Sequence, residues 1–339
     1  MTKKSPWDIE EKSFPQGGTS NDLMRFFLRY AILAPSAHNT QPWKCIIREG
    51  TLEIHKDEKH MLQVGDPTQR QTYIGLGAFL ENFIIASSHW GYRAILTEGV
   101  FISDDSLICK VTLRRSLDLK NNRLFPGILK RHTNRGRYNP SSIPSSITRR
   151  LQNYREKHTR LYCINDHEAK DRISQLVQKG MFIGLSLKPL RKELADYVSL
   201  SEQNRDTGLI LEAMVEHPVD MREGREWVDK HLEPKTESIE WGVKFRSCPL
   251  IIIIATETDG PEAWVEAGRV MERVLLEGAV NGHTHDLCAA PVEIPSLITP
   301  LRREIDYQYR PQVLFRLGVP SNNNFTKHSN RRINIISEL

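Results

Sequence analysis

GAFLENFIIASSHWG (Gly77 to Gly91) and GRVMERVLLEGAVNG (Gly268 to Gly282) are two stretches of one chain that share a pattern. In each, two glycines lie 14 residues apart, and Glu81 or Glu272 follows the first glycine by four positions. Fourteen residues make about four helical turns, so each glycine pair lies on one helix face and permits close packing. The pattern predicts an internal repeat, although two unrelated amphipathic helices would also produce it.

Length and composition agree with two folded units. The chain has 339 residues, and a domain takes roughly 100–200. Its 39% hydrophobic and 26% charged residues are ordinary for a globular protein. The net charge of +5 suits an anionic ligand such as phosphate better than a nucleic acid. Without a signal-peptide pattern or an apolar run long enough to cross a bilayer, we expect a cytoplasmic protein that binds neither nucleic acid nor membrane.

The first unit is predicted to contain helices and strands in a mixed order. Residues 1–20 suggest a loose arm. Asp22 is a plausible N-cap for the helix that follows, and Pro35 ends it. A hairpin, a buried helix and two strands are predicted after it, at residues 44–57, Tyr73 to Trp90, Ala94 to Val100 and Leu107 to Arg114.

The second unit begins near Leu124 and carries a long charged segment at 166–240 with a helical pattern. Two short helices and a strand at Arg160 to Asn165 precede that segment. The buried strand PLIIIIATET, the helix EAWVEAGRVMERVLLEGAVN and the strand QVLFRLGV follow it.

Several polar groups allow two interpretations. His283, His285 and Cys288 have a spacing that suggests a metal, but a fourth ligand is not evident, so we predict no metal site. Asp66 and Arg70 favour a structural ion pair that caps the next helix over a catalytic pair. His38 favours packing or hydrogen bonding over proton donation. The five scattered cysteines are predicted to be reduced structural thiols.

Four motifs resemble the FMN-dependent nitroreductase superfamily. PSAHNTQPW (Pro35 to Trp43) is similar to the family's flavin-contacting loop, and RHTNRGRY (Arg131 to Tyr138) is similar to its phosphate-binding opening. APVEIP (Ala290 to Pro295) resembles the turn beside the flavin's reactive edge, and RLGVP (Arg316 to Pro320) resembles the closing strand. DPTQRQTYIGLGAFLENFIIA resembles the tandem, Acg-type branch. The resemblance covers nearly the whole chain from about residue 22, except 166–240.

The resemblance implies an α+β, nitroreductase-like fold with two degenerate repeats that form an intramolecular pseudo-dimer. The expected units are 1–120 and 121–339, the second with a helical, lid-like insertion at about 166–240. Each unit keeps one complementary half of a flavin site, so one complete site per monomeric chain is expected. No GxGxxG follows a strand, so a Rossmann NAD site is not expected.

The implied cofactor is FMN, and the implied binding residues come from the first three of these motifs and from the basic tail at Arg331 and Arg332. Arg131, Thr133, Arg331 and Arg332 suit its phosphate, and Arg135 suits the N1/C2 carbonyl side of the ring. Main-chain groups around Glu293 and Ile294 are expected near flavin N5. The remaining predicted binding residues are His132, Pro35, Ser36, Ala37, Asn39, Gln41, Pro291 and Val292.

The implied activity is hydride transfer from NAD(P)H through FMN to a nitroaromatic, quinone or similar acceptor. Solvent can supply the acceptor's proton, so no catalytic residue is predicted. The alternative is a flavin-holding protein with little turnover, because part of residues 180–235 is expected to cover the flavin. Tyr197 or a methionine near 214–221 is a candidate to face the ring.

Overall fold

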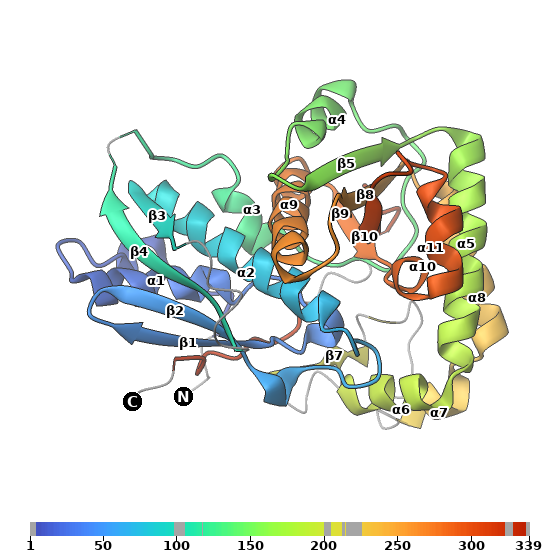
Figure 1. The fold of residues 1–339 in the computed structure, drawn as a ribbon, viewed down its shortest axis with the longest axis horizontal. Coiled ribbons are helices and arrows are strands. Elements are labelled where there is room, and N and C mark those ends of the chain that lie inside the picture. The colour runs from blue at the N-terminus through green and yellow to red at the C-terminus, as the bar shows by residue number, and fades with distance from the viewer. Residues whose placement is uncertain are drawn as a thin grey trace.

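The fold contains two units that lie side by side, each with an antiparallel sheet and packed helices (Figure 1). It is seen in a computed structural model that describes residues 5–97, 106–116, 118–199, 205–211, 214, 226–322 and 328–336. This arrangement confirms the predicted α+β class. No helix among these residues is long and apolar enough to cross a membrane.

The two sheets have corresponding strand orders, β1-β2-β4-β3 and β5-β8-β10-β9. The first unit comprises α1 (Ser20–Ala31), β1 (Trp43–Arg48), β2 (Thr51–Lys56), α2 (Arg70–His89), β3 (Tyr92–Leu96) and β4 (Leu107–Arg115). The second comprises α3 (Phe125–Lys130), α4 (Ser145–Gln152), β5 (Thr159–Ile164), β8 (Leu250–Thr256), α9 (Pro261–Val280), β9 (Thr284–Leu287), α10 (Ala290–Glu293), α11 (Pro295–Arg302) and β10 (Arg310–Gly318). The end of the strand predicted at Ala94 to Val100, at 98–100, lies outside the described residues.

The sheet order locates the insertion between two paired strands. β1 and β2 are joined by a tight turn at Glu49 and Gly50, whereas β5 and β8 pair although a long helical segment separates them. This insert contains α5 (His167–Ser186), α6 (Lys188–Tyr197), β6 (Val198–Ser199), β7 (Leu209–Ile210), α7 (Glu226–His231) and α8 (Pro234–Ser247). The insert therefore replaces a hairpin turn without changing the sheet.

The repeated helices α2 and α9 cross each other at their first glycines. A methyl group on Gly77 would overlap the carbonyl oxygen of Val265, and one on Gly268 would overlap that of Ile74. Each glycine therefore contacts the backbone of the residue that lies three positions before the other glycine in the sequence. Such a reciprocal contact is expected where two repeats are related by an approximate twofold axis.

Two local predictions at the N-terminus are wrong. The N-cap of α1 is Thr19, whose side chain accepts from the Asp22 amide, while the Asp22 carboxylate accepts from the Thr19 amide. Asp22 is therefore the second member of a capping box. The arm is also not loose from residue 5 onward, because Phe14 stacks on Trp90 with ring centroids 5.4 Å apart and Trp7 docks against the C-terminal tail.

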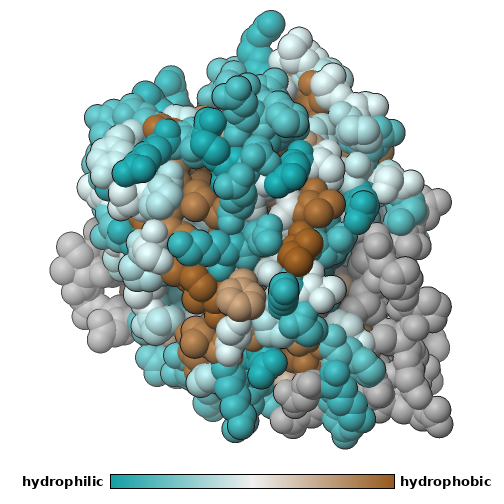
Figure 2. Space-filling model, turned by 90° about the vertical axis from the view of Figure 1, so that its right-hand side faces the viewer, coloured by the Kyte–Doolittle hydropathy of each residue, from teal (hydrophilic) through white to brown (hydrophobic). Residues whose placement is uncertain are grey.

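The insert has an apolar inner side and a hydrophilic outer side. Its own small core includes Ala195, Leu211 and Val228. The outer side, with α5 and α8, is largely hydrophilic with scattered apolar groups (Figure 2). Phe182 and Ile239 are exposed apolar side chains on these two helices. The strongly charged composition of 166–240 therefore reflects a solvated surface, as the sequence indicated.

Candidate functional site

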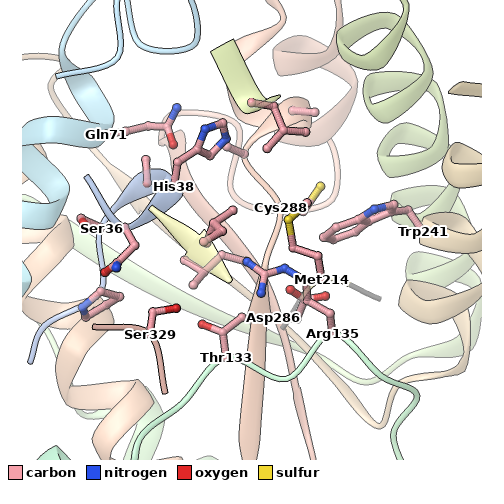
Figure 3. A pocket seen from close by; sticks show the side chains of 18 of the residues that line it. Ser36, His38, Gln71, Thr133, Arg135, Met214, Trp241, Asp286, Cys288 and Ser329 are labelled. Carbon is pink, nitrogen blue, oxygen red and sulfur yellow. The ribbon is translucent and has the colours of Figure 1, made fainter. Parts of the chain in front are cut away.

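A cavity of about 830 Å³ lies where the two units and the insert meet (Figure 3). This volume is in the range of small-molecule and cofactor sites, about 300–1,000 Å³. The first unit contributes the loop after α1 and the start of α2. The second contributes the loop after α3, strand β9 and the C-terminal tail, and the insert closes the remaining side.

Two buried arginines give one end of the cavity its positive charge. Arg131 and Arg331 both donate to the Leu33 carbonyl, at 3.2 and 3.4 Å. The carboxylate of Glu272 lies close to them, with its Oε1 4.0 Å from Arg131 Nε, and its charge also acts on Arg331. Burial, and then the charge of Arg131, lowers the pKa of Arg331 to about 9. Two desolvated cations beside one carboxylate favour an anionic ligand.

Histidines and a tryptophan surround this cationic end. His285 Nε2 lies 3.4 Å from Arg131 Nη1 and 3.5 Å from Thr133 Oγ1. The ring centroids of His328 and Trp7 lie 3.9 Å apart with the rings tilted by 34°, and the guanidinium of Arg331 lies over the same tryptophan. Burial, followed by the nearby arginines and His132, lowers the pKa of His328 to about 3. His328 is therefore neutral at physiological pH without a ligand.

The loop after α1 has an unusual backbone held by hydrogen bonds. His38, Asn39 and Gln41 all have positive φ angles, of 47°, 55° and 56°. The Gln41 amide donates to Ser36 Oγ at 2.9 Å, and Asn39 Nδ2 donates to the carbonyls of Gly208 and Asn330. Left-handed conformations of non-glycine residues are costly and often occur at ligand sites. Burial, the main cause, lowers the pKa of His38 to about 4, so its imidazole is also neutral.

The structure brings most of the sequence-predicted site residues to this cavity. Those that line it are Pro35, Ser36, Ala37, Asn39, Arg131, His132, Thr133, Arg135, Val292 and Arg331. Those outside its lining are Gln41, Pro291, Glu293, Ile294 and Arg332.

The residues outside the lining have partners of their own. The Gln41 side chain donates to the Asp206 carbonyl at 2.6 Å and accepts from the Arg332 amide at 2.7 Å. The Arg332 side chain pairs with Asp57. The amides of Glu293 and Ile294 donate to the Ala289 and Ala290 carbonyls, so the expectation that they meet flavin N5 is not retained.

Arg70 is paired differently from the prediction. Its guanidinium lies 3.3 Å from Glu293, whereas Asp66 accepts from the amides of Gln71 and Thr72. The prediction that Asp66 caps α2 is correct, but Arg70 joins the first unit to α10. Burial, partly offset by Arg70, raises the pKa of Glu293 to about 7.

Sequence reasoning missed lining residues whose positions depend on distant contacts. They include Trp7 in the arm, Asp286 and Cys288 at β9, Trp241 in α8, and His328 in the tail. A large aromatic residue in an otherwise polar arm was the available signal for Trp7. For Asp286, the signal was an acidic residue between His285 and Cys288, two residues already considered as a possible metal site.

The insert contributes apolar lining and is tied to the first unit. Met181, Leu185 and Trp241 line the cavity from α5 and α8, and Leu194 does so from α6. Glu193 accepts from the amides of residues 63–65. Met214 is a lining residue, and the Tyr197 ring lies 6.0 Å from that of His38. Met221, the other methionine of the predicted window, lies outside the described residues.

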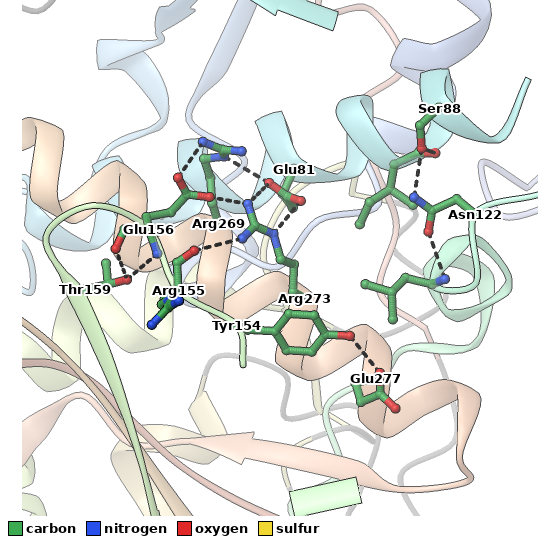
Figure 4. Close-up of polar contacts among 12 residues, drawn as sticks. Glu81, Ser88, Asn122, Tyr154, Arg155, Glu156, Thr159, Arg269, Arg273 and Glu277 are labelled. Atoms are coloured by element: carbon green, nitrogen blue, oxygen red, sulfur yellow. Dashed lines mark hydrogen bonds and ion pairs between the residues drawn. The ribbon is translucent and has the colours of Figure 1, made fainter. Parts of the chain in front are cut away.

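The corresponding position in the other half of the molecule holds an ion-pair network (Figure 4). Glu81 accepts from Arg269 at 2.9 Å and from Arg273 at 2.7 Å, and both arginines also pair with Glu156. Glu81 and Glu272 are the matching glutamates of the repeat. Glu81 therefore pairs with arginines that a second carboxylate also neutralises. Glu272 instead lies close to Arg131 at the cavity.

The comparisons with known proteins find nitroreductases. No protein-family model matches the chain. It is 31% identical over 80 residues to the "Putative NAD(P)H nitroreductase acg" of Mycobacterium tuberculosis, a match that spans 24% of each chain. The "Putative NAD(P)H nitroreductase Rv3131" of that organism is 23% identical over 302 residues, which cover 88% of this chain and 85% of the relative.

The structural comparison finds proteins of the same description at low similarity. A nitroreductase with bound FMN from Bacteroides fragilis is 12% identical, with a TM-score of 0.41, and the match covers 64% of this chain and 99% of that protein. The sequence match to Rv3131 is long enough to include parts of both units. Both sequence matches are thus to relatives described as putative NAD(P)H nitroreductases, and the longer one spans most of this chain.

Proposed function

We propose that the chain is an FMN-dependent oxidoreductase that takes hydride from NAD(P)H and reduces a nitroaromatic, quinone or similar acceptor. The observation that carries the proposal is the pair of buried guanidiniums, Arg131 and Arg331, at one end of the cavity. Their Nε atoms have no hydrogen-bond partner among the described residues. A phosphate dianion would supply both the missing acceptors and the missing negative charge.

The cavity residues fit the other parts of FMN by their chemistry. Thr133 and His132 would add uncharged donors at the phosphate. The small residues Pro35, Ser36 and Ala37 would pack against a flat ring, and Gly75 faces this loop without a side chain. Arg135 would face the carbonyl side of the ring. Bound FMN supplies the two-electron chemistry, while these residues bind it, orient it and exclude water.

One FMN per monomeric chain is the expected stoichiometry. The ion-pair network of Glu81, Arg269, Arg273 and Glu156 fills the position that corresponds to the cationic end of the cavity. The contact between α2 and α9 lies inside the chain, so a second copy is not needed to complete the site. Two bound flavins per chain would contradict this proposal, as would a dimer that joins residues 35–43 of one copy to residues 131–138 of another.

The second candidate function is flavin holding with little turnover. It is favoured by the contacts that tie the insert down, since Gly208 exchanges hydrogen bonds with Asn39 and Glu193 binds the 63–65 segment. An insert held this closely would restrict access to the cavity. We place turnover first, because these contacts of the described residues lie at the edge of the first unit.

A reconstitution experiment separates the two candidates. The purified chain would be titrated with FMN and FAD, and the released flavin quantified per chain. NADH and NADPH oxidation would then be followed with menadione or a nitrofuran as acceptor. Binding of FMN with acceptor-dependent oxidation supports the first function, and FMN binding without oxidation supports the second. Failure to bind FMN contradicts both.

A further inference from the structure

Asp286 is a buried acid of the cavity that the proposed FMN contacts leave unused. Its side chain lines the cavity and is 1% exposed. One carboxylate oxygen, Oδ2, accepts from Arg316 Nη2 at 2.9 Å and from Nε at 3.3 Å. The other, Oδ1, has no hydrogen-bond partner in the described part of the chain. A buried carboxylate oxygen without a donor is costly, so a ligand donor is its expected partner.

Rigid neighbours fix the position of this carboxylate. Asp286 pairs in register with Arg316 across β9 and β10, so the two side chains emerge together from one sheet face. Arg316 is fully buried, and its guanidinium lies over the Tyr138 ring at 4.3 Å. Arg135 lines the same cavity near Asp286 (Figure 3). Burial lowers the pKa of the Arg135 guanidinium, and the negative charge of Asp286 partly offsets this lowering.

We propose that Asp286 and Arg135 together recognise a ring edge that carries a carbonyl beside an N–H group. In FMN, the proposed cofactor on which this inference rests, that edge is the C2 carbonyl and N3–H of the pyrimidine ring. Arg135 donates to the carbonyl, and Asp286 Oδ1 accepts from N3–H. Asp286 is thus a specificity-determining residue that selects an unsubstituted N3.

The charge of Asp286 has a second consequence. Reduction places negative charge on the N1/C2 side of the ring, which Arg135 stabilises and a nearby carboxylate opposes. Asp286 therefore holds the flavin midpoint potential below the value that Arg135 alone would set. A residue that only supported the fold would not shift this potential through its charge.

A two-by-two titration tests the hydrogen bond. FMN and N3-methyl-FMN would be titrated into the wild-type chain and Asp286→Ala, with Asp306→Asn as an exposed-acid control. In the wild type, methylation is expected to weaken binding about tenfold to a hundredfold, the scale of a hydrogen bond to a charged group. In Asp286→Ala, FMN and N3-methyl-FMN are expected to bind with nearly equal affinity, because the acceptor for N3–H is already absent.

The outcomes distinguish this inference from the proposed function. Equal methylation penalties in the wild type and Asp286→Ala would overturn the inference while leaving FMN binding intact. If the wild type binds neither flavin, the proposed function itself fails. Since Asp286→Ala leaves Arg316 without its carboxylate, Asp286→Asn provides a nearly isosteric second variant. Its midpoint potential is expected to rise, and an unchanged or lower potential in the folded variant would contradict the placement of Asp286 beside the ring.

Discussion

Replacing Glu193 with glutamine is expected to loosen the insert from the first unit. The carboxylate of this α6 residue accepts three backbone hydrogen bonds. Oε1 accepts from the amides of Gln63 and Val64, at 2.7 and 3.0 Å, and Oε2 accepts from Gly65 at 2.7 Å. These bonds attach α6, whose Leu194 lines the cavity, to the segment before α2.

The geometry sets the size of the effect. A glutamine oxygen can keep two of the three contacts, but its amide group would then face the Gly65 N–H donor to donor. One charge-assisted bond is lost, worth about 1.5–3 kcal/mol in a buried setting. Because the contact is partly exposed, we discount this to about 1–2 kcal/mol. Local opening of the insert should then be roughly 5- to 30-fold more frequent.

Amide hydrogen exchange measures that opening directly. The amides of residues 63–65 and of α6 should exchange faster by about this factor in Glu193→Gln, while the buried amides of α2 serve as an internal reference. Glu168→Gln on α5 is the matched control, since its carboxylate is largely exposed and pairs only with Arg172 among its described contacts. If the insert limits access, quinone reduction by the FMN-loaded variant should also accelerate.

Two results would refute the reasoning in different places. Unchanged exchange at residues 63–65 would show that Glu193 does not hold the segment. Faster exchange with an unchanged rate of quinone reduction would show that the insert opens without limiting access. The second result would favour a partner-binding role for the insert.

Three further predictions concern the cationic end, the helix crossing and acid stability. Arg131→Ala should weaken FMN binding by about 2–3 kcal/mol in a fluorescence titration, whereas Arg149→Ala, an exposed control, should not; full flavin retention would remove the phosphate assignment. Gly77→Ala should lower the free energy of unfolding in urea by about 1–3 kcal/mol, because its methyl group overlaps the Val265 carbonyl. Gly184→Ala, in open space on α5, should instead raise it by about 0.5–1 kcal/mol, and equal effects would argue against a tight crossing. Burial raises the pKa of Glu277, but hydrogen bonds from Arg123, Tyr154 and Arg150 outweigh it and hold the pKa at about 2. Since this folded-state value lies below the unfolded one of about 4.3, the stability it contributes is present above that pH and lost as pH falls towards 2. Glu277→Gln should flatten the dependence of stability on pH in this window, and an identical acid profile would contradict the assignment.

The sequence predicted those parts of the fold that depend on short-range patterns. The repeated pattern correctly indicated two matching helices, and Gly77 and Gly268 lie in their contact. The expectation that each glycine pair shares one helix face is wrong, because Gly91 and Gly282 follow the ends of α2 and α9 with φ angles of 80° and 77°. The Pro35 to Trp43 and Arg131 to Tyr138 motifs predicted residues that now line one cavity, although they lie in different units. Both results come from local constraints that are visible in a short stretch of sequence.

Long-range pairing was beyond the same reasoning. That Arg70 pairs with Glu293 rather than Asp66 depends on the docking of α10 against α2, which no local spacing encodes. Trp7 enters the site because its indole N–H donates to the carbonyl of Ser329 at 3.1 Å, a contact between the two ends of the chain. The unused oxygen of Asp286 likewise becomes evident only once the strand register pairs it with Arg316.

The difference between the two halves explains why a repeated fold would keep a single site. Two positions before the crossing glycine, α2 has Gly75, which lines the cavity and faces Ser36 without a side chain. At the matching position α9 has Glu266, whose carboxylate accepts from the backbone amide of His158 at 2.9 Å. In the first half the loop therefore lies beside a residue without a side chain, and in the second it is hydrogen-bonded to the carboxylate of a helix residue. Because Glu156 from the same loop neutralises Arg269 and Arg273, the described residues of that half lack the unbalanced positive charge that a phosphate-bearing ligand needs.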